Sequence, residues 1–293
     1  MKHFFTRHQG RGSYDLFSGH CHYTPGIGGI MMLLVLFLFG ALIGNLATLG
    51  LTYLAGSAFV EDFGTIVSYP IMFIPPLLYA SVMSRLNALS TEAIELDRND
   101  IIKGRTGKTV LVCMLSCVAA AFIVEPVSIL LPPMPQWLKD VMTRMLENTP
   151  VWATLISVSV FAPLFEEWLC RGIVLRGLLV TMNPFSAIAV SSVFFAILHI
   201  NPWQAVPAFC LGMLFGYVYY KTRSLKMAML MHCTNNTLAV VTSRIPQLKD
   251  AETFMDVLSP WAYTCIFIAC CVIVASAVVF FRQFQENQVY PRQ

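Results

Sequence analysis

Charged residues are scarce in this chain. Asp, Glu, Lys and Arg together make up 12% of its 293 residues, against about 25% in an ordinary soluble domain. Hydrophobic residues make up 57%, and they form long blocks instead of the one-sided stripes typical of soluble amphipathic helices. Each block approaches the roughly 20 residues that cross a hydrocarbon core of about 30 Å. The composition therefore argues against a soluble protein and predicts an all-α, polytopic transmembrane helical bundle.

Cysteine pairs with metal-binding spacing are also lacking. The nine cysteines are scattered, mostly within apolar blocks, and none forms a CxxC motif. A disulfide framework or a cysteine-bound metal is therefore not expected, and small polarizable packing residues are the simpler interpretation. No cleavable signal peptide is evident, because the first apolar block starts near Ile27, after a long polar leader.

The apolar blocks predict about eight membrane spans, with seven as the main alternative. Pro70, Pro75 and Pro76 lie inside the second block, so a kinked or broken helix is expected there. The fifth to seventh blocks are short. The expected spans are residues 27–54, 65–83, 109–131, 151–174, 185–200, 203–220, 225–242 and 260–281.

The distribution of basic residues supports the count of eight. When eight spans are threaded through a bilayer, fifteen of the 19 Lys and Arg residues fall on the side that holds both termini. The other side receives only Lys139, Arg144, Arg244 and Lys249. Because cytoplasmic loops of membrane proteins carry an excess of Lys and Arg, we expect both termini to be cytoplasmic.

The chain is expected to form one membrane domain, since no repeat, low-complexity tract or second soluble domain is evident. The expected parts are a polar N-terminal tail, a transmembrane helical domain and a C-terminal tail, at residues 1–26, 27–282 and 283–293. His20, Cys21 and His22 in the first tail could bind a metal. Nothing nearby supplies a rigid frame or further ligands, so a solvated tail is the preferred interpretation.

Ionisable residues inside the predicted spans indicate a structural or functional role, since inserting each one into a membrane costs about 2.5–3.5 kcal/mol on insertion scales. His199 and His232 are the only histidines outside the N-terminal tail, and both lie in apolar blocks. Glu166 and Glu167 lie in a third block. Two histidines and adjacent carboxylates in different spans indicate chemistry, whereas Glu125 is interpreted as structural or as a rim contact for a substrate.

Helical spacing groups these side chains further. Glu167 and Arg171 are i and i+4, so they share a helix face and can form a supporting ion pair. Glu166 then points about 100° away and is free to face the bundle interior. His232 and Asn236 are also i and i+4, and they present two hydrogen-bonding side chains on one face.

These residue types suit hydrolysis. A carboxylate removed from water holds a proton more readily, as a general base near neutral pH requires. Glu166 could take a proton from a water molecule that His199 holds, while His232 and Asn236 donate hydrogen bonds to an oxyanion. The same donors allow a metal version, in which Glu166, His199 and His232 form an open catalytic zinc set. The residues alone do not choose between the two versions.

Three motifs follow one another on successive apolar blocks, namely EExxxR at 166–171, FxxxH at 195–199 and HxxxN at 232–236. This series resembles the type II CAAX prenyl endopeptidases, within a wider group of intramembrane proteases called CPBP or Abi. The resemblance covers a catalytic core at about 151–242. It implies that Glu166 and His199 activate water and that His232 and Asn236 stabilise the oxyanion. We prefer the metal-free glutamate mechanism, which requires no cofactor, and keep a zinc metalloprotease as the alternative.

The resemblance also implies partners and a location. We expect a peptide or protein substrate at the membrane, contact with the lipid bilayer and no nucleic acid, and the oligomeric state stays open. The absence of an evident eukaryotic targeting signal favours a multi-pass protein of a bacterial plasma membrane.

Two other functions remain open. A proton-coupled transporter would use intramembrane carboxylates and histidines as a relay, but the paired halves typical of such proteins are not evident here. A catalytically silent immunity or scaffold protein could keep the same fold, although the intact motif set argues against lost activity.

Overall fold

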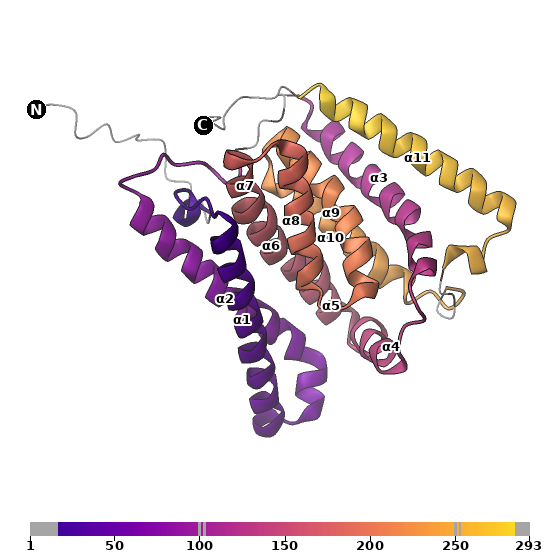
Figure 1. The fold of residues 1–293 in the computed structure, drawn as a ribbon. Coiled ribbons are helices and arrows are strands. Elements are labelled where there is room, and N and C mark those ends of the chain that lie inside the picture. Colours follow the sequence, from indigo (N-terminus) through magenta and orange to yellow (C-terminus); the bar gives the residue numbers. More distant parts are fainter. Residues whose placement is uncertain (1–16, 99–100, 102–103, 249–250, 252, 285–293) are drawn as a thin grey trace, which may run out of the picture.

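The structure is a computed structural model (Figure 1) that describes residues 17–98, 101, 104–248, 251 and 253–284. Within these residues the chain is helical and has no strand, as the composition predicts. The longer helices are α1 (Ile27–Ala55), α2 (Ser57–Asn87), α3 (Thr106–Val124), α8 (Pro184–Leu198), α9 (Pro202–Thr222), α10 (Leu225–Thr242) and α11 (Pro260–Arg282). The shorter ones outside the central rod are η1 (Ser18–His20), η2 (Glu125–Leu130), α4 (Gln136–Thr143), η3 (Arg144–Asn148) and η6 (Phe254–Asp256).

A continuous helical rod occupies the centre of the molecule. Its successive pieces are α5 (Val151–Thr154), η4 (Leu155–Phe161), α6 (Ala162–Glu167), η5 (Trp168–Leu175) and α7 (Arg176–Thr181), of which η4 and η5 are π-helical. In the most apolar stretch of this rod 61% of the residues are buried, against 17–33% in the four other long apolar helices. The rod is therefore surrounded by protein, while the other long helices keep a free apolar face.

The remaining helices cover the rod from two sides. α1 and α2 form a hairpin that contacts the rod mainly through α2, and in Figure 1 the rod lies between this hairpin and α10. α10 contacts η4 and α6, α8 contacts η5, and α9 packs along α8. α3 packs against α10 and α11. Side chains of α2 and α10 can therefore reach α6 from different directions.

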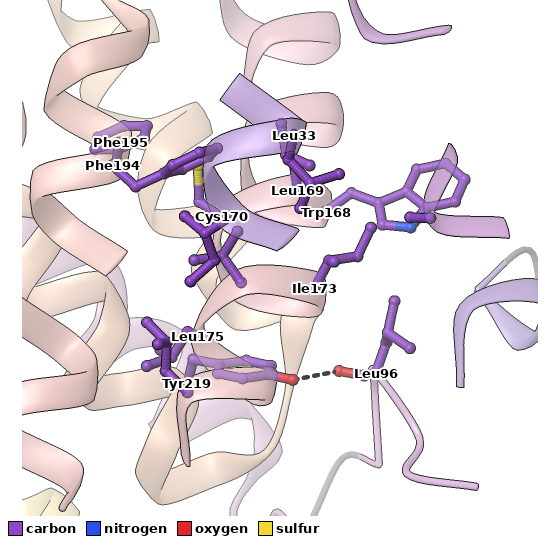
Figure 2. Close-up of a cluster of buried hydrophobic side chains, with 14 of the residues drawn as sticks. Leu33, Leu96, Trp168, Leu169, Cys170, Ile173, Leu175, Phe194, Phe195 and Tyr219 are labelled. Atoms are coloured by element: carbon purple, nitrogen blue, oxygen red, sulfur yellow. Dashed lines mark hydrogen bonds between the residues drawn. The ribbon is translucent and has the colours of Figure 1, made fainter. Parts of the chain in front are cut away.

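Apolar side chains of the rod form the main core. Leu169 and Ile173 of η5 are fully buried in one cluster with Phe195 of α8 (Figure 2). At the edge of this cluster the Tyr219 hydroxyl of α9 donates a hydrogen bond of 2.8 Å to the carbonyl of Leu96. The bond fastens the loop between α2 and α3 to the core.

The predicted spans correspond to helices, but only part of the span count is supported. Within the described residues, five helical stretches are long and apolar enough to cross a membrane, namely Ile27–Ala55, Ser57–Asn87, Thr106–Val127, Val151–Thr181 and Pro260–Arg282. Pro184–Leu198 is apolar but shorter. Exposed apolar side chains such as Leu49, Leu54 and Trp261 suit contact with lipid. The count of eight crossings and the cytoplasmic position of both termini stay predictions.

The second helix starts earlier than predicted and is not broken. α2 starts at Ser57 instead of residue 65 and continues through Pro70, Pro75 and Pro76. Of the two expected forms, kinked or broken, the broken one is wrong and the kinked one stays a prediction. Each proline removes one backbone N–H from the helical ladder. Packing against α1 and the rod keeps the helix continuous.

The residues directly before α1 are not a solvated tail. His20, Cys21 and Tyr23 are buried, and Arg176 of α7 donates hydrogen bonds to their backbone carbonyls at 2.9, 3.0 and 2.6 Å. The solvated-tail interpretation is wrong here because a buried guanidinium satisfies these carbonyls in place of water. Residues 1–16 and 285–293 of the two predicted tails lie outside the described residues.

Candidate active site

Two adjacent glutamates lie at the end of α6, in the middle of the buried rod. α6 is flanked by the π-helical pieces η4 and η5, and π-helical turns are frequent at functional sites. Glu166 is 6% exposed and Glu167 is completely buried. Their carboxylates contact different neighbours, since Glu166 reaches α2 and Glu167 reaches α10.

Glu167 and Arg171 form the ion pair that their spacing predicts. The Arg171 Nη1 atom is 2.8 Å from Oε1 of Glu167, and both side chains are inaccessible to solvent. Nη2 of Arg171 donates to the carbonyl of Gly212 at 3.0 Å. The guanidinium also lies 4.4 and 5.7 Å from the ring centroids of Phe195 and Phe215, within cation–π range. The pair therefore joins the rod to α8 and α9.

His232 of α10 lies between the two glutamates. Its Nδ1 atom is 2.9 Å from Oε1 of Glu167, and its Nε2 atom is 4.0 Å from Oε2 of Glu166. Because an ionised carboxylate only accepts hydrogen bonds, Nδ1 of His232 carries a proton. The imidazole packs edge-on against Phe195, with ring centroids 5.3 Å apart. Glu167 thus fixes the direction in which His232 presents Nε2 to Glu166.

Glu166 is held by a residue from outside the predicted core. The Tyr69 hydroxyl of α2 donates a hydrogen bond to Oε1 of Glu166. Oε2 of Glu166 is buried and has no hydrogen-bond partner among the described residues. One oxygen of this carboxylate therefore accepts a hydrogen bond from Tyr69, and the other faces His232.

His199 lies beside this centre without touching a carboxylate among the described residues. Its Nδ1 atom is 3.0 Å from the carbonyl oxygen of Phe195, so Nδ1 donates this bond and Nε2 is the nitrogen left for another partner. The ring of Phe195 packs edge-on against both His199 and His232. Ile200 follows with a φ of 63°, an uncommon conformation for a β-branched residue. Here the chain turns directly after His199.

Of two adjacent asparagines on α10, Asn236 faces the rod. Its Nδ2 atom donates to the carbonyl of Val158 in η4 at 2.8 Å, and its Oδ1 atom accepts from Nδ2 of Asn235 at 3.1 Å. An amide nitrogen has two N–H groups, so one of them remains for a ligand. Asn236 and His232 occupy one face of α10, as their spacing predicts.

The three possible zinc ligands do not form a zinc site in this arrangement. Among the described residues, no group of three or more His, Cys, Asp or Glu side chains is arranged to hold a metal ion. Glu166 and His232 approach each other, but His199 directs its Nδ1 at a backbone carbonyl. The same finding applies to the described residues His20, Cys21 and His22.

Glu125 is separate from this centre. Its Oε1 atom accepts a hydrogen bond from the backbone N–H of Phe254, at the start of η6. This contact ties the end of α3 to the segment before α11. Of the two interpretations of Glu125, the structural one agrees with this geometry.

Sequence reasoning missed Tyr69 because no local pattern connects it to Glu166, which lies 97 residues further along the chain. One physical signal was present, since a tyrosine hydroxyl at membrane depth usually requires a hydrogen-bond partner. That signal identifies Tyr69 as a residue in need of a partner, but it does not name the partner. The packing of α2 against α6 supplies it.

The buried glutamates, imidazole and amide, held in a bundle with long apolar helices, define an integral membrane protein with a polar centre inside the bundle. Residues 148–238 match the model of a family described as type II CAAX prenyl endopeptidase, Rce1-like. The match includes Glu166, Glu167, Arg171, His199, His232 and Asn236, so the resemblance is confirmed for this segment. No curated protein and no solved structure was found to match the chain.

Proposed function

We propose that this protein is an intramembrane endopeptidase that hydrolyses a peptide bond of a membrane-associated peptide or protein. One observation carries the proposal. The Oε2 atom of Glu166 has no partner among the described residues, and it lies 4.0 Å from Nε2 of a histidine that a second glutamate orients. Two atoms at this separation can both hydrogen-bond to one water oxygen, at about 2.8 Å from each. The family match of this segment supports the same reaction.

In the proposed reaction Glu166 is the general base. Its Oε2 atom takes a proton from water as the water oxygen attacks the scissile carbonyl carbon. The same proton then passes to the leaving amine as the carbon–nitrogen bond breaks. The lone pair on Nε2 of His199 can accept a hydrogen bond from the attacking water, which keeps the role that the sequence suggests for this residue.

His232 and Asn236 stabilise the oxyanion. Because Nδ1–H of His232 is bound to Glu167, donation to the oxyanion through Nε2 requires a proton on that atom as well, so His232 acts as the imidazolium in this scheme. The second N–H of Asn236 is the other donor. Glu167 and Arg171 are positioning residues, since they act through His232. Zinc remains the alternative to this metal-free scheme, and a bacterial plasma membrane is the proposed location.

The test is cleavage of a quenched fluorescent peptide library by the detergent-purified protein. Glu166→Gln keeps the side-chain shape and removes the base, so turnover should fall by more than about 100-fold. His232→Ala should have a similar effect. Glu125→Gln is the matched control, because it changes a partly buried glutamate outside the site, and it should retain turnover.

Each outcome of this experiment has a defined meaning. Equal signals from wild type and Glu166→Gln would mean contamination and would contradict the proposal. Loss of turnover with a chelator, restored by zinc, would replace the metal-free scheme with the metal-dependent one. Proton flux in liposomes that survives replacement of Asn236 would favour the transporter.

A further inference from the structure

The contact between Tyr69 and Glu166 joins the candidate active site to a part of the chain outside the family match. Tyr69 belongs to α2, and the matched segment begins at residue 148. We propose that Tyr69 is a positioning residue for catalysis, whose hydroxyl holds one oxygen of Glu166 so that the other faces the reacting water. This inference rests on the proposed function and adds the α1–α2 hairpin to the catalytic apparatus.

The ring of Tyr69 is fixed by a stack of aromatic side chains. Tyr69 stacks on Phe73 with centroids 5.7 Å apart and planes at 29°, and Phe73 stacks on Phe165 at 5.6 Å and 17°. Phe37 of α1 also contacts Phe73, with ring centroids 5.2 Å apart and planes at 58°. Phe165 precedes Glu166 directly in α6. The stack therefore sets the position of the hydroxyl relative to the carboxylate that it binds.

The hydrogen bond selects one orientation of a flexible side chain. The carboxylate of a glutamate rotates about several single bonds, and a misplacement of about 1 Å can cost on the order of 100-fold in rate. With Oε1 bound to Tyr69, Oε2 is the oxygen that lies 4.0 Å from Nε2 of His232. Without the hydroxyl, either oxygen of Glu166 could turn away from the position that attack requires.

Tyr69→Phe is the decisive variant because it retains the ring and its stack on Phe73 and removes only the donor. We expect kcat to fall by about tenfold to a hundredfold, the range of a hydrogen bond to a charged group. KM should stay within about twofold, since Tyr69 acts through Glu166. Tyr219→Phe is the matched control, because it removes the hydroxyl of a tyrosine whose hydrogen bond goes to the Leu96 carbonyl and not to the candidate site. It should change thermal stability and leave kcat unchanged.

A second readout does not depend on turnover. In infrared difference spectra, the carboxylate band that disappears in Glu166→Gln should shift in Tyr69→Phe and keep its position in Tyr219→Phe. A band that stays in place in Tyr69→Phe would overturn the inference. The inference would also be overturned if Tyr69→Phe had the kcat of wild type. It would be overturned as well if the activity lost in Tyr69→Phe were no greater than the fraction of this variant that is unfolded.

Failure of this inference differs from failure of the proposed function. A wild-type protein that hydrolyses peptides, together with an inactive Glu166→Gln and a fully active Tyr69→Phe, would overturn the inference alone. Wild-type protein without specific hydrolysis would overturn the proposed function and, with it, a catalytic role for Tyr69.

Discussion

Glu167 accepts hydrogen bonds from two side chains, Arg171 and His232. Removing its charge in Glu167→Gln leaves the guanidinium of Arg171 buried without compensation, which typically costs about 3–5 kcal/mol. We therefore expect a large drop in the thermal unfolding midpoint in detergent. Turnover should also be lost, because the orientation of His232 depends on the same carboxylate.

Removing both charges separates these two effects. In Glu167→Gln/Arg171→Met no uncompensated charge remains, and buried pairs can often be replaced by apolar groups at little cost. Most of the lost stability should return, whereas turnover should stay low. If the double variant were no more stable than Glu167→Gln, the ion pair would not be the source of the loss. The exposed Lys226, which pairs with Asp97, offers a control in Lys226→Ala, where little change is expected.

For single residues, the sequence predicts contacts within one helix better than contacts between helices. The Glu167–Arg171 pair and the shared face of His232 and Asn236 follow from helical spacing alone. The contact of Glu167 with His232 was not predicted, because it depends on how the rod and α10 are rotated toward each other. For the same reason, the sequence does not specify how His199 lies relative to Glu166, and the role of His199 stays a prediction.

Among the helices, α1 lies directly against the backbone of α2 at Gly40. A Cβ atom added at Gly40 would overlap the backbone carbonyl of Met72, and a backbone group cannot move aside as a side-chain end can. Met72 lies one helical turn after Tyr69 on α2. We expect Gly40→Ala to separate the two helices, lower the thermal midpoint and reduce turnover through Tyr69.

Gly50→Ala is the matched control for this prediction. Gly50 lies in the same helix, but a Cβ atom there would meet nothing within 4 Å. Alanine favours helix over glycine by roughly 0.5–1 kcal/mol, so stability should be equal or higher and turnover unchanged. Equal stability of the two variants would contradict the inferred packing of the hairpin.

The segment before α1 should make stability depend on pH. Burial lowers the pKa of His20 below its ordinary value of 6.5, and the nearby Arg176 charge acts in the same direction, although the hydrogen bond to the Leu77 carbonyl opposes them. With a lowered pKa in the folded state, the unfolded chain binds more protons below about pH 6.5. The stabilisation is therefore present above that pH and is lost as the pH falls through the lower folded value.

Thermal midpoints at pH 7.5 and 5.5 test this expectation. Between these two pH values the wild-type protein should lose more stability than His20→Gln. His22→Gln is the comparison, since His22 is less buried and its Nδ1 atom already meets the Thr91 carbonyl. An identical pH dependence in wild type and His20→Gln would show that His20 does not titrate with unfolding.

The helices themselves follow the hydrophobic blocks closely. The expected span at 225–242 coincides with α10 (Leu225–Thr242). α2 extends beyond its block because Glu61 and Asp62 interrupt the apolar run without interrupting the helix. The π-helical pieces η4 and η5 had no signal in the sequence, since their hydrogen-bond register is set by tertiary packing and not by residue type.

For the whole molecule, the open question is how many helices cross the bilayer. α9 and α10 match expected spans, yet they are absent from the five stretches in the described residues that are long and apolar enough. Both carry polar groups, such as Lys221 and His232, on buried positions. The side chains of α9 and α10 need not be as apolar as side chains that face lipid, because neighbouring helices surround much of the surface of these two helices. A hydropathy threshold can therefore miss a span that lies in the centre of a bundle.

Reporter fusions that are active on only one side of the membrane decide the count. With eight crossings, fusions in the 88–105 loop, the 222–225 turn and the C-terminus should all report the cytoplasmic side. Fusions in the 131–150 and 243–259 connections should report the opposite side, where few basic residues lie. An N-terminus and a C-terminus on opposite sides would establish an odd number of crossings, as in the seven-span alternative. If the 131–150 and 243–259 connections lay on different sides, then the rod, α8, α9 and α10 could not all cross the membrane, because four crossings return the chain to the side on which it began.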